Sequence, residues 1–340
     1  MFARVKDLIH VVSGVGLWVA MVVGPSAAAA ETIKIGLIKI GTGGPLFVAQ
    51  ERGYFAAEGL AADFVYFDSA PPIAVAVVSG SVDFGTGGLT AGFYSLAGQG
   101  ALRIIAGAIS EAPGFHFVGY LASNHAYEAG LRSPKDFGGH SIAVPQFGSA
   151  NHYNVSLLAE KYGFDMKNLR LLALQSLPNV ATAIAGGQAD AAPLNATMAL
   201  ALVQRGDAKI LGWVGDETPW QFGAVWTATK TANDKRDTVA RFLRAYKRGT
   251  REYYEAFSGP DGKRADGPKA AEIEAIIAKY IGEPLERAKQ DIVYVDPEAR
   301  LDIQDVLHQI SWYGSQGMIK SKFDANSVVD RRYVIPMPER

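Results

Sequence analysis

Two short segments decide the fold: Gly80-Ser81-Val82-Asp83-Phe84-Gly85 and, further along the chain, Gly187-Gln188-Ala189-Asp190-Ala191. Each follows an apolar stretch that we expect to be a helix and runs into a short apolar stretch that we expect to be a strand. A second unit, made of a strand, a Gly/Ser/Thr-rich loop, a helix and a glycine, spans residues 33–53 and recurs at 141–163. Two different markers repeated at nearly the same offset predict two lobes that are built alike.

Around these segments the chain alternates between strand-like and helix-like stretches. Residues 32–40, 62–67 and 102–109 are rich in β-branched and aromatic residues, whereas 46–52, 71–79 and 89–97 have helical character. This alternation is typical of an α/β protein with largely parallel strand pairing. After about residue 225 the pattern becomes helical, and residues 233–257 carry a single apolar face.

Length and composition narrow the class of protein. A chain of 340 residues is too long for one compact core, and 49% hydrophobic with 20% charged residues is ordinary for a globular protein. The net charge of −1 argues against a nucleic-acid or anionic-membrane partner. The sequence contains no cysteine, which excludes disulfides, thiolate metal sites, cysteine nucleophiles and a lipid-modified N-terminal cysteine. The histidines show no metal-ligand spacing, so we expect no metal and no cofactor.

The first thirty residues have the layout of a secretory signal peptide. Arg4 and Lys6 precede an apolar run at 11–23, Pro25 interrupts it, and small residues follow at 27–30. A membrane-spanning helix needs roughly 20 apolar residues, more than this run offers. We therefore expect residues 1–30 to be removed by cleavage near Ala30, and the mature protein to reside in the periplasm.

Several motifs, taken together and in this order, resemble those of one family. They are Gly53-Tyr54-Phe55 with Glu58-Gly59-Leu60, then Gly80 to Gly85, Ser133-Pro134-Lys135-Asp136-Phe137-Gly138-Gly139, Gly148-Ser149, and Gly187 to Ala191. As a set they are similar to the solute-binding proteins of ABC transporters for sulfonates, taurine, nitrate and thiamine precursors. The resemblance covers residues 33–234.

This resemblance implies a type II periplasmic binding-protein fold, with two α/β lobes, two hinge crossovers and a ligand held between the lobes. We expect lobe one to comprise 31–117 and 225–340, with the C-terminal helices packed on it, and lobe two to comprise 118–224. The crossovers are expected near 115–120 and 222–229. The implied function is to capture a small molecule and deliver it to a cognate ABC permease in the inner membrane. We expect a monomer.

The ligand contacts are expected where strands run into helices. Helix N-termini offer free N–H groups and partial positive charge, glycine allows close approach, and Ser or Thr hydroxyls can donate outward. Three segments fit this description: 41–44, 86–88 and 147–151. The candidate ligand-binding residues are Thr42, Gly43, Gly44, Thr86, Gly87, Phe115, Gly148, Ser149, Asn151 and Asn195. Any of them could instead be a structural turn, a helix cap or, for Phe115, part of the core.

Gly148-Ser149 matches the lobe-two ligand contact of the family pattern. Because no acidic side chain lies near these loops in the sequence, we expect the ligand to be a monoanion, such as a sulfonate or an aromatic or aliphatic carboxylate. Two alternatives remain open. A neutral or cationic heterocycle such as a pyrimidine thiamine precursor is one, although Ile40-Gly41-Thr42-Gly43-Gly44 stands where those binders carry Trp-x-Pro-Asn.

The other alternative is an enzyme. Gly85-Thr86-Gly87-Gly88 imitates a dinucleotide-binding loop, but Thr90 stands at the position of its third glycine. The phosphate-binding and nucleophile-elbow motifs are missing from the sequence, and a pyrimidine-forming enzyme of this fold depends on cysteines. We therefore predict a binding protein and not an enzyme.

Overall fold

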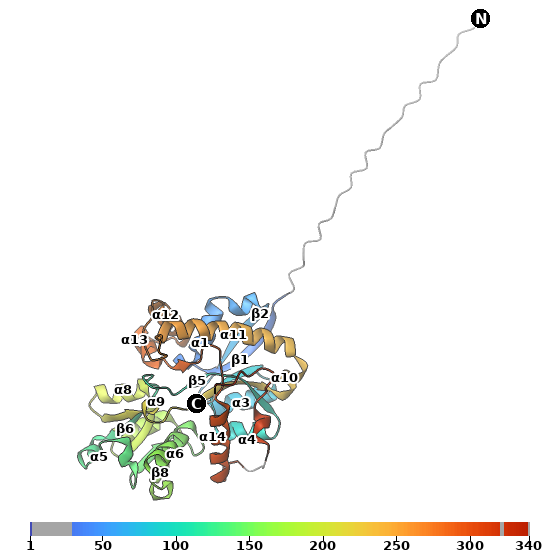
Figure 1. Ribbon diagram of the computed structural model, residues 1–340. Coiled ribbons are helices and arrows are strands. Elements are labelled where there is room, and N and C mark those ends of the chain that lie inside the picture. Colours follow the sequence, from blue (N-terminus) through green and yellow to red (C-terminus); the bar gives the residue numbers. More distant parts are fainter. Residues whose placement is uncertain (2–28, 320–322, 339–340) are drawn as a thin grey trace.

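The computed structural model describes residues 1, 29–319 and 323–338 (Figure 1). The predicted signal peptide lies almost entirely outside these residues. Within the described part of the chain, no helix is both long enough and apolar enough to cross a bilayer.

Two five-stranded sheets organise the molecule. The first has the order β2-β1-β3-β11-β4 and contains β1 (Glu31–Ile38), β2 (Leu60–Phe67), β3 (Phe84–Gly88), β4 (Leu102–Gly107) and β11 (Gly223–Ala228). The second has the order β8-β7-β9-β6-β10 and contains β6 (Val118–Ser123), β7 (Ser141–Val144), β8 (Arg170–Ala173), β9 (Ala191–Asn195) and β10 (Ala208–Trp213). In each sheet three strands pair in parallel, and the fourth strand in the order is antiparallel to its neighbours. The two sheets therefore have the same topology, as the repeated segments predict.

The repeated aspartates perform the same task in both sheets. The Asp83 carboxylate accepts the backbone N–H of Lys34 in β1 at 2.9 Å, and the Asp190 carboxylate accepts that of Ser141 in β7 at 2.8 Å. Each aspartate also donates its own N–H to the carbonyl of the same partner residue. Asp83 and Asp190 thus tie the start of one strand to the turn that precedes its neighbour, which explains the repeated Gly-x-x-Asp pattern.

The chain passes between the sheets twice. The two connections run side by side, and the Glu111 and Trp220 backbones exchange hydrogen bonds of 2.9 and 3.1 Å. The predicted crossover positions, 115–120 and 222–229, are wrong by several residues, because Val118–Ser123 and Gly223–Ala228 pair within the sheets as β6 and β11. The short strands β5 (Ile109–Ser110) and β12 (Tyr294–Val295) form a small antiparallel pair beside the first connection.

Helices cover both sheets. Those that follow strands in the first sheet are α1 (Gly44–Glu51), α2 (Tyr54–Ala57), α3 (Ala70–Ser79) and α4 (Ala91–Gly98). Those of the second sheet are α5 (Asn124–Glu128), α6 (Ala150–Tyr162), α7 (Leu177–Ala185), α8 (Ala196–Gln204) and α9 (Val214–Glu217). The C-terminal part supplies α10 (Thr229–Asp234), α11 (Arg236–Phe257), α12 (Ala270–Ile281), α13 (Leu285–Ala288) and α14 (Ile303–Ser315).

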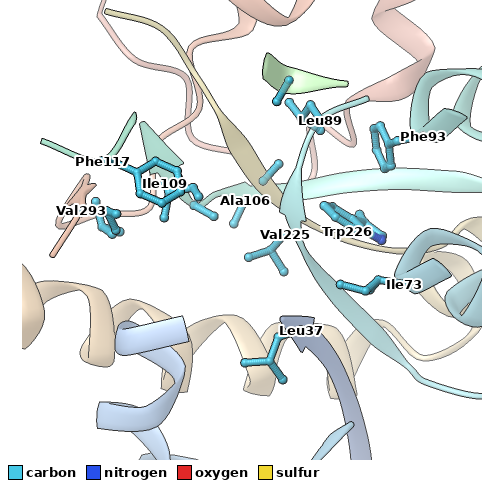
Figure 2. Packing of buried hydrophobic residues seen from close by; sticks show 14 of the residues in the cluster. Leu37, Ile73, Leu89, Phe93, Ala106, Ile109, Phe117, Val225, Trp226 and Val293 are labelled. Atoms are coloured by element: carbon cyan, nitrogen blue, oxygen red, sulfur yellow. The ribbon is translucent and has the colours of Figure 1, made fainter. Parts of the chain in front are cut away.

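The long helix α11 returns to the first sheet, as expected (Figure 1). Phe242, on its apolar face, stacks on Phe84 of β3 with ring centroids 4.0 Å apart. Helix α14 differs from this expectation, because it also contacts lobe two. Its residue His308 lies 2.7 Å from the hydroxyl of Tyr153 in α6. The apolar core is continuous from Leu37 through Val225 to Val293 of the C-terminal segment (Figure 2).

A close approach between helices makes one glycine of α11 a sensitive position. A Cβ atom at Gly249 would lie 2.2 Å from the Pro45 carbonyl oxygen of α1, whereas one at Gly314 in α14 would meet no atom within 4 Å. We predict that Gly249→Ala lowers the free energy of unfolding by about 1 to 3 kcal/mol, because backbone must shift to accept the methyl group. The matched change Gly314→Ala should be neutral or stabilising by up to about 1 kcal/mol. Urea unfolding of both variants measures the difference, and equal effects would contradict this packing.

Candidate functional site

The loops at the carboxyl ends of the strands meet between the two lobes. On one side the Ala91 N–H, at the start of α4, donates to the Gly148 carbonyl after β7 at 3.0 Å. On the other side Asp291 of the C-terminal segment contacts both Gly41 after β1 and Thr197 at the start of α8. The two lobes therefore touch directly at both of these places, and the loops at 41–44 and 147–151 lie at the contacts.

The loop after β1 has glycines for packing reasons. A Cβ atom at Gly43 would lie 2.5 Å from the Phe47 ring, and one at Gly44 would lie 2.5 Å from the Tyr253 ring. Both glycines are buried, while Thr42 between Gly41 and Gly43 is partly exposed. The sequence correctly locates this loop at the strand-to-helix junction, but the backbone of Gly43 and Gly44 faces the core aromatics.

A carboxylate accepts a hydrogen bond from the backbone N–H group at the start of this loop. The Asp291 side chain accepts the Gly41 N–H at 3.3 Å and the Thr197 hydroxyl at 2.5 Å, and burial raises the pKa of this aspartic acid. The expectation that no acidic side chain lies near the ligand loops is therefore wrong. Asp291 is 250 residues from Gly41 in the chain, so no local sequence pattern could have placed it there.

The segment around Thr86 and Gly87 is strand and not loop. Thr86 pairs with Val225, and its buried hydroxyl donates to the Ala224 carbonyl at 3.2 Å. Strand β3 continues through Gly88, so the turn into α4 is made by Leu89 and by Thr90, whose hydroxyl accepts the Phe93 N–H. The prediction of a loop at 86–88 is wrong, because a Gly-rich stretch can also form a strand where neighbouring rings come close, while ligand contacts of Thr86 and Gly87 stay a prediction. Trp226 and Phe222 pack on these glycines.

The segment at 147–151 forms the expected turn into a helix. Gly148 has a φ of +77°, a conformation suited to glycine, and the Ser149 hydroxyl caps α6 by accepting the His152 N–H at 3.3 Å. The same hydroxyl donates to the Gln146 carbonyl at 2.7 Å. His152 completes the cap by accepting the Gly148 N–H, and burial lowers the pKa of His152 to about 4, which keeps the ring neutral for this role.

The remaining predicted residues take different positions. Asn151 is buried and donates to the Pro193 carbonyl at 3.0 Å, whereas the buried side-chain oxygen of Asn195 has no hydrogen-bond partner among the described residues. Phe115 is 1% exposed and lies edge-on to Tyr294, so its ring belongs to the core. Asn151 is thus tied to β9 and Phe115 to the core, while Asn195 keeps a buried side-chain oxygen that is unpaired within the described residues.

One cavity lies beside this region and contains residues that the sequence did not suggest. It has a volume of about 270 Å³ and is bordered by the first connection, α8, the end of β10 and the C-terminal segment. Its charged lining residues are Arg264 and Lys289, and its rings are His116 and Trp213. No motif marks these positions, because they come together through the return of the chain from lobe two.

A buried polar cluster fixes α14 to the second connection. The Asp305 carboxylate accepts the Gln221 N–H at 3.0 Å and the Gln309 side-chain N–H at 2.7 Å. Gln221 in turn donates hydrogen bonds from its side-chain amide to two carbonyls. One belongs to Ile109, which precedes the first connection, and the other to Gly223, which follows the second. Burial raises the pKa of Asp305 from its ordinary value of 3.8 to about 6.

This raised pKa predicts a pH-dependent stability. The folded protein holds the Asp305 proton more tightly than the unfolded chain does. This proton therefore contributes its full share to the free energy of unfolding below about pH 4, and the contribution is lost as pH rises to about 6. The loss is on the order of 3 kcal/mol. Asp305→Asn should raise the free energy of unfolding at pH 7 and flatten the decline between pH 4 and 6. Denaturant unfolding across this pH range tests the prediction. Asp234→Asn, at an exposed position, is the control, and its free energy of unfolding should still decline between pH 4 and 6.

Two sheets of the same topology, joined by paired connections and facing each other through their strand ends, define the periplasmic binding-protein fold. The chain belongs to the NMT1/THI5-like family, whose model matches residues 43–256. No curated protein matches the chain.

Solved structures resemble this fold along most of the chain. The alkanesulfonate-binding protein SsuA from Xanthomonas axonopodis pv. citri, bound to MOPS, is 19% identical with a TM-score of 0.68, covering 89% of this chain and 99% of its own. The periplasmic nitrate-binding protein NrtA from Synechocystis PCC 6803 is 13% identical with a TM-score of 0.66, covering 89% and 87%. A cysteine-to-serine mutant of DSZB in complex with biphenyl-2-sulfinic acid is 13% identical with a TM-score of 0.57, covering 90% and 97%.

Proposed function

We propose that this protein is the substrate-binding component of an ABC importer, which captures a small organic anion between its lobes and delivers it to a permease in the inner membrane. The observation that carries the proposal is the pair of like sheets whose strand-end loops meet across the inter-lobe region, with two adjacent connections as the hinge. In such an arrangement, a ligand that contacts both lobes stabilises the closed form through contacts that the open form lacks.

Membership of this family and the similar solved structures both favour a transport protein over an enzyme. Proteins named for binding alkanesulfonate and nitrate share this fold, and both names describe the capture of an oxyanion. The N-terminal signal layout supports export to the periplasm, and a monomer is the form we propose. Thr42, Ser149 and Asn195 stay predicted ligand contacts.

A second ligand class has one specific observation in its favour. The Asp291 carboxylate joins Gly41 to Thr197 between the lobes, and the Asn195 side-chain oxygen, directly before α8, has no hydrogen-bond partner within the part of the chain that the structure describes. A neutral or cationic heterocycle that donates hydrogen bonds would suit these two groups better than an anion would. The two classes are distinguished by the charge of the solutes that bind.

A solute that binds the folded protein alone must stabilise it against heat. Screening the mature protein with sulfonates, carboxylates, nitrate and aminopyrimidines should raise Tm for one class, by an amount that corresponds to about 2.7 kcal/mol at a concentration of 100 times Kd. The expected class is the organic anions, with no chemical change in the recovered solute. Consumption of the solute would indicate an enzyme, and a lack of saturable stabilisation by every class would contradict a receptor.

A further inference from the structure

The segments on both sides of helix α14 are tied to the same strand of lobe one. Before the helix, the Ala299 carbonyl accepts the Gly107 N–H of β4 at 2.9 Å. After the helix, the Asp330 N–H donates to the Ile104 carbonyl of β4, also at 2.9 Å. The two flanking segments pair with each other as well. Because both flanks are held by β4, we expect α14 to move with lobe one when the lobes move.

Buried polar contacts within the helix add to this anchoring. The Tyr94 hydroxyl of α4 donates to the Gln309 side-chain oxygen at 2.9 Å, and the Gln309 amide donates to the Gln221 carbonyl in the second connection at 2.9 Å. The rings of Tyr94 and Tyr313 also lie against each other, with centroids 5.8 Å apart. Helix α14 is thus fixed to lobe one and to the hinge.

Other side chains of α14 extend to α6 in lobe two. The Trp312 ring lies edge-on to the rings of His152 and Tyr153, with centroid distances of 5.1 and 5.4 Å. One turn earlier, His308 lies 2.7 Å from the Tyr153 hydroxyl, and its other ring nitrogen is 3.5 Å from the Glu160 carboxylate. Helix α14 therefore bridges α4 of lobe one and α6 of lobe two (Figure 1).

The contacts of α14 differ in their distance from the hinge. Asp305 accepts the Gln221 N–H of the second connection at 3.0 Å, whereas Tyr313, near the end of the helix, donates its hydroxyl to the Ser149 carbonyl at 3.4 Å. At a rise of 1.5 Å per residue, Asp305 and Tyr313 are about 12 Å apart along the helix. Rotation of the lobes about the connections would therefore keep the contact at Asp305 and separate the far end of α14 from α6.

The inter-lobe contacts at the strand ends are smaller. The Ala91 N–H donates one hydrogen bond to the Gly148 carbonyl, and the Thr197 hydroxyl donates one to Asp291. The contact between α14 and α6 instead combines ring packing with polar groups, and ring pairs stabilise beyond the area that they bury. We therefore expect α14 to favour the closed form more than either of these hydrogen bonds does.

We propose that α14 is a strap, anchored in lobe one, that holds lobe two in the closed position through Trp312 and His308. This proposal rests on the lobe movement of the proposed receptor function, and it names the element that sets the balance between the open and closed forms. Because the strap also contacts the backbone of Ser149, a predicted ligand contact, it would connect lobe closure to the ligand loop.

The test compares Trp312→Ala and His308→Ala with Ser311→Ala, which alters an exposed position on the same helix. Each change is made in the mature protein carrying spin labels at Ser81→Cys on lobe one and Ala129→Cys on lobe two, both exposed positions. The distance distribution between the labels is recorded without added solute, and urea unfolding verifies that each variant is folded. The His308 side chain is exposed, so its variant should fold even if Trp312→Ala does not.

We expect both strap variants to lower the ratio of the short to the long distance component by about threefold or more, because each loses a contact that only the closed form makes. Ser311→Ala should leave this ratio unchanged. If the wild type shows both components and neither strap variant lowers the ratio, the strap is overturned while the receptor function stands. A single, identical distance in the wild type and in all variants would contradict the lobe movement itself, and with it both proposals.

Discussion

The structure depends on one topological constraint: each sheet receives its antiparallel strand after the chain has crossed from the other lobe. Strand β6 enters the second sheet directly after the first connection, and β11 enters the first sheet directly after the second connection. The backbones of Glu111 and Trp220 pair where these connections pass each other. The lobes are thus joined by two adjacent connecting segments. The carboxyl ends of the parallel strands in both sheets must therefore face the same inter-lobe region.

The features that sequence reasoning recovered are those with local causes. The Gly-x-x-Asp segments at Asp83 and Asp190 repeat because each carboxylate must accept a backbone N–H at the start of a neighbouring strand. The turn at Gly148 and the cap at Ser149 are likewise set by the residues next to them. Such features recur within a few positions of sequence, so the lobes, their alternation of strand and helix, and the cap of α6 could all be predicted.

The features that sequence reasoning missed arise from contacts between distant parts of the chain. Asp291 reaches Gly41, and Arg264 reaches the cavity beside Trp213, only because the C-terminal segment passes between the lobes. Thr86 is a reasonable loop candidate by composition, yet β11 pairs with this segment and makes it a central strand. The sequence therefore predicts where the inter-lobe region lies, while the charge inside it is decided by residues that no local pattern connects to it.

We expect a solute that binds between the lobes to hold them together. Because the sequence contains no cysteine, spin labels can be attached at two introduced cysteines alone, Ser81→Cys on lobe one and Ala129→Cys on lobe two, both at exposed positions. The distance distribution between the labels should be broad in the free protein and should narrow to its shortest component when the solute that gives the largest rise in Tm is added at saturation. The same distribution with and without this bound solute would contradict the account.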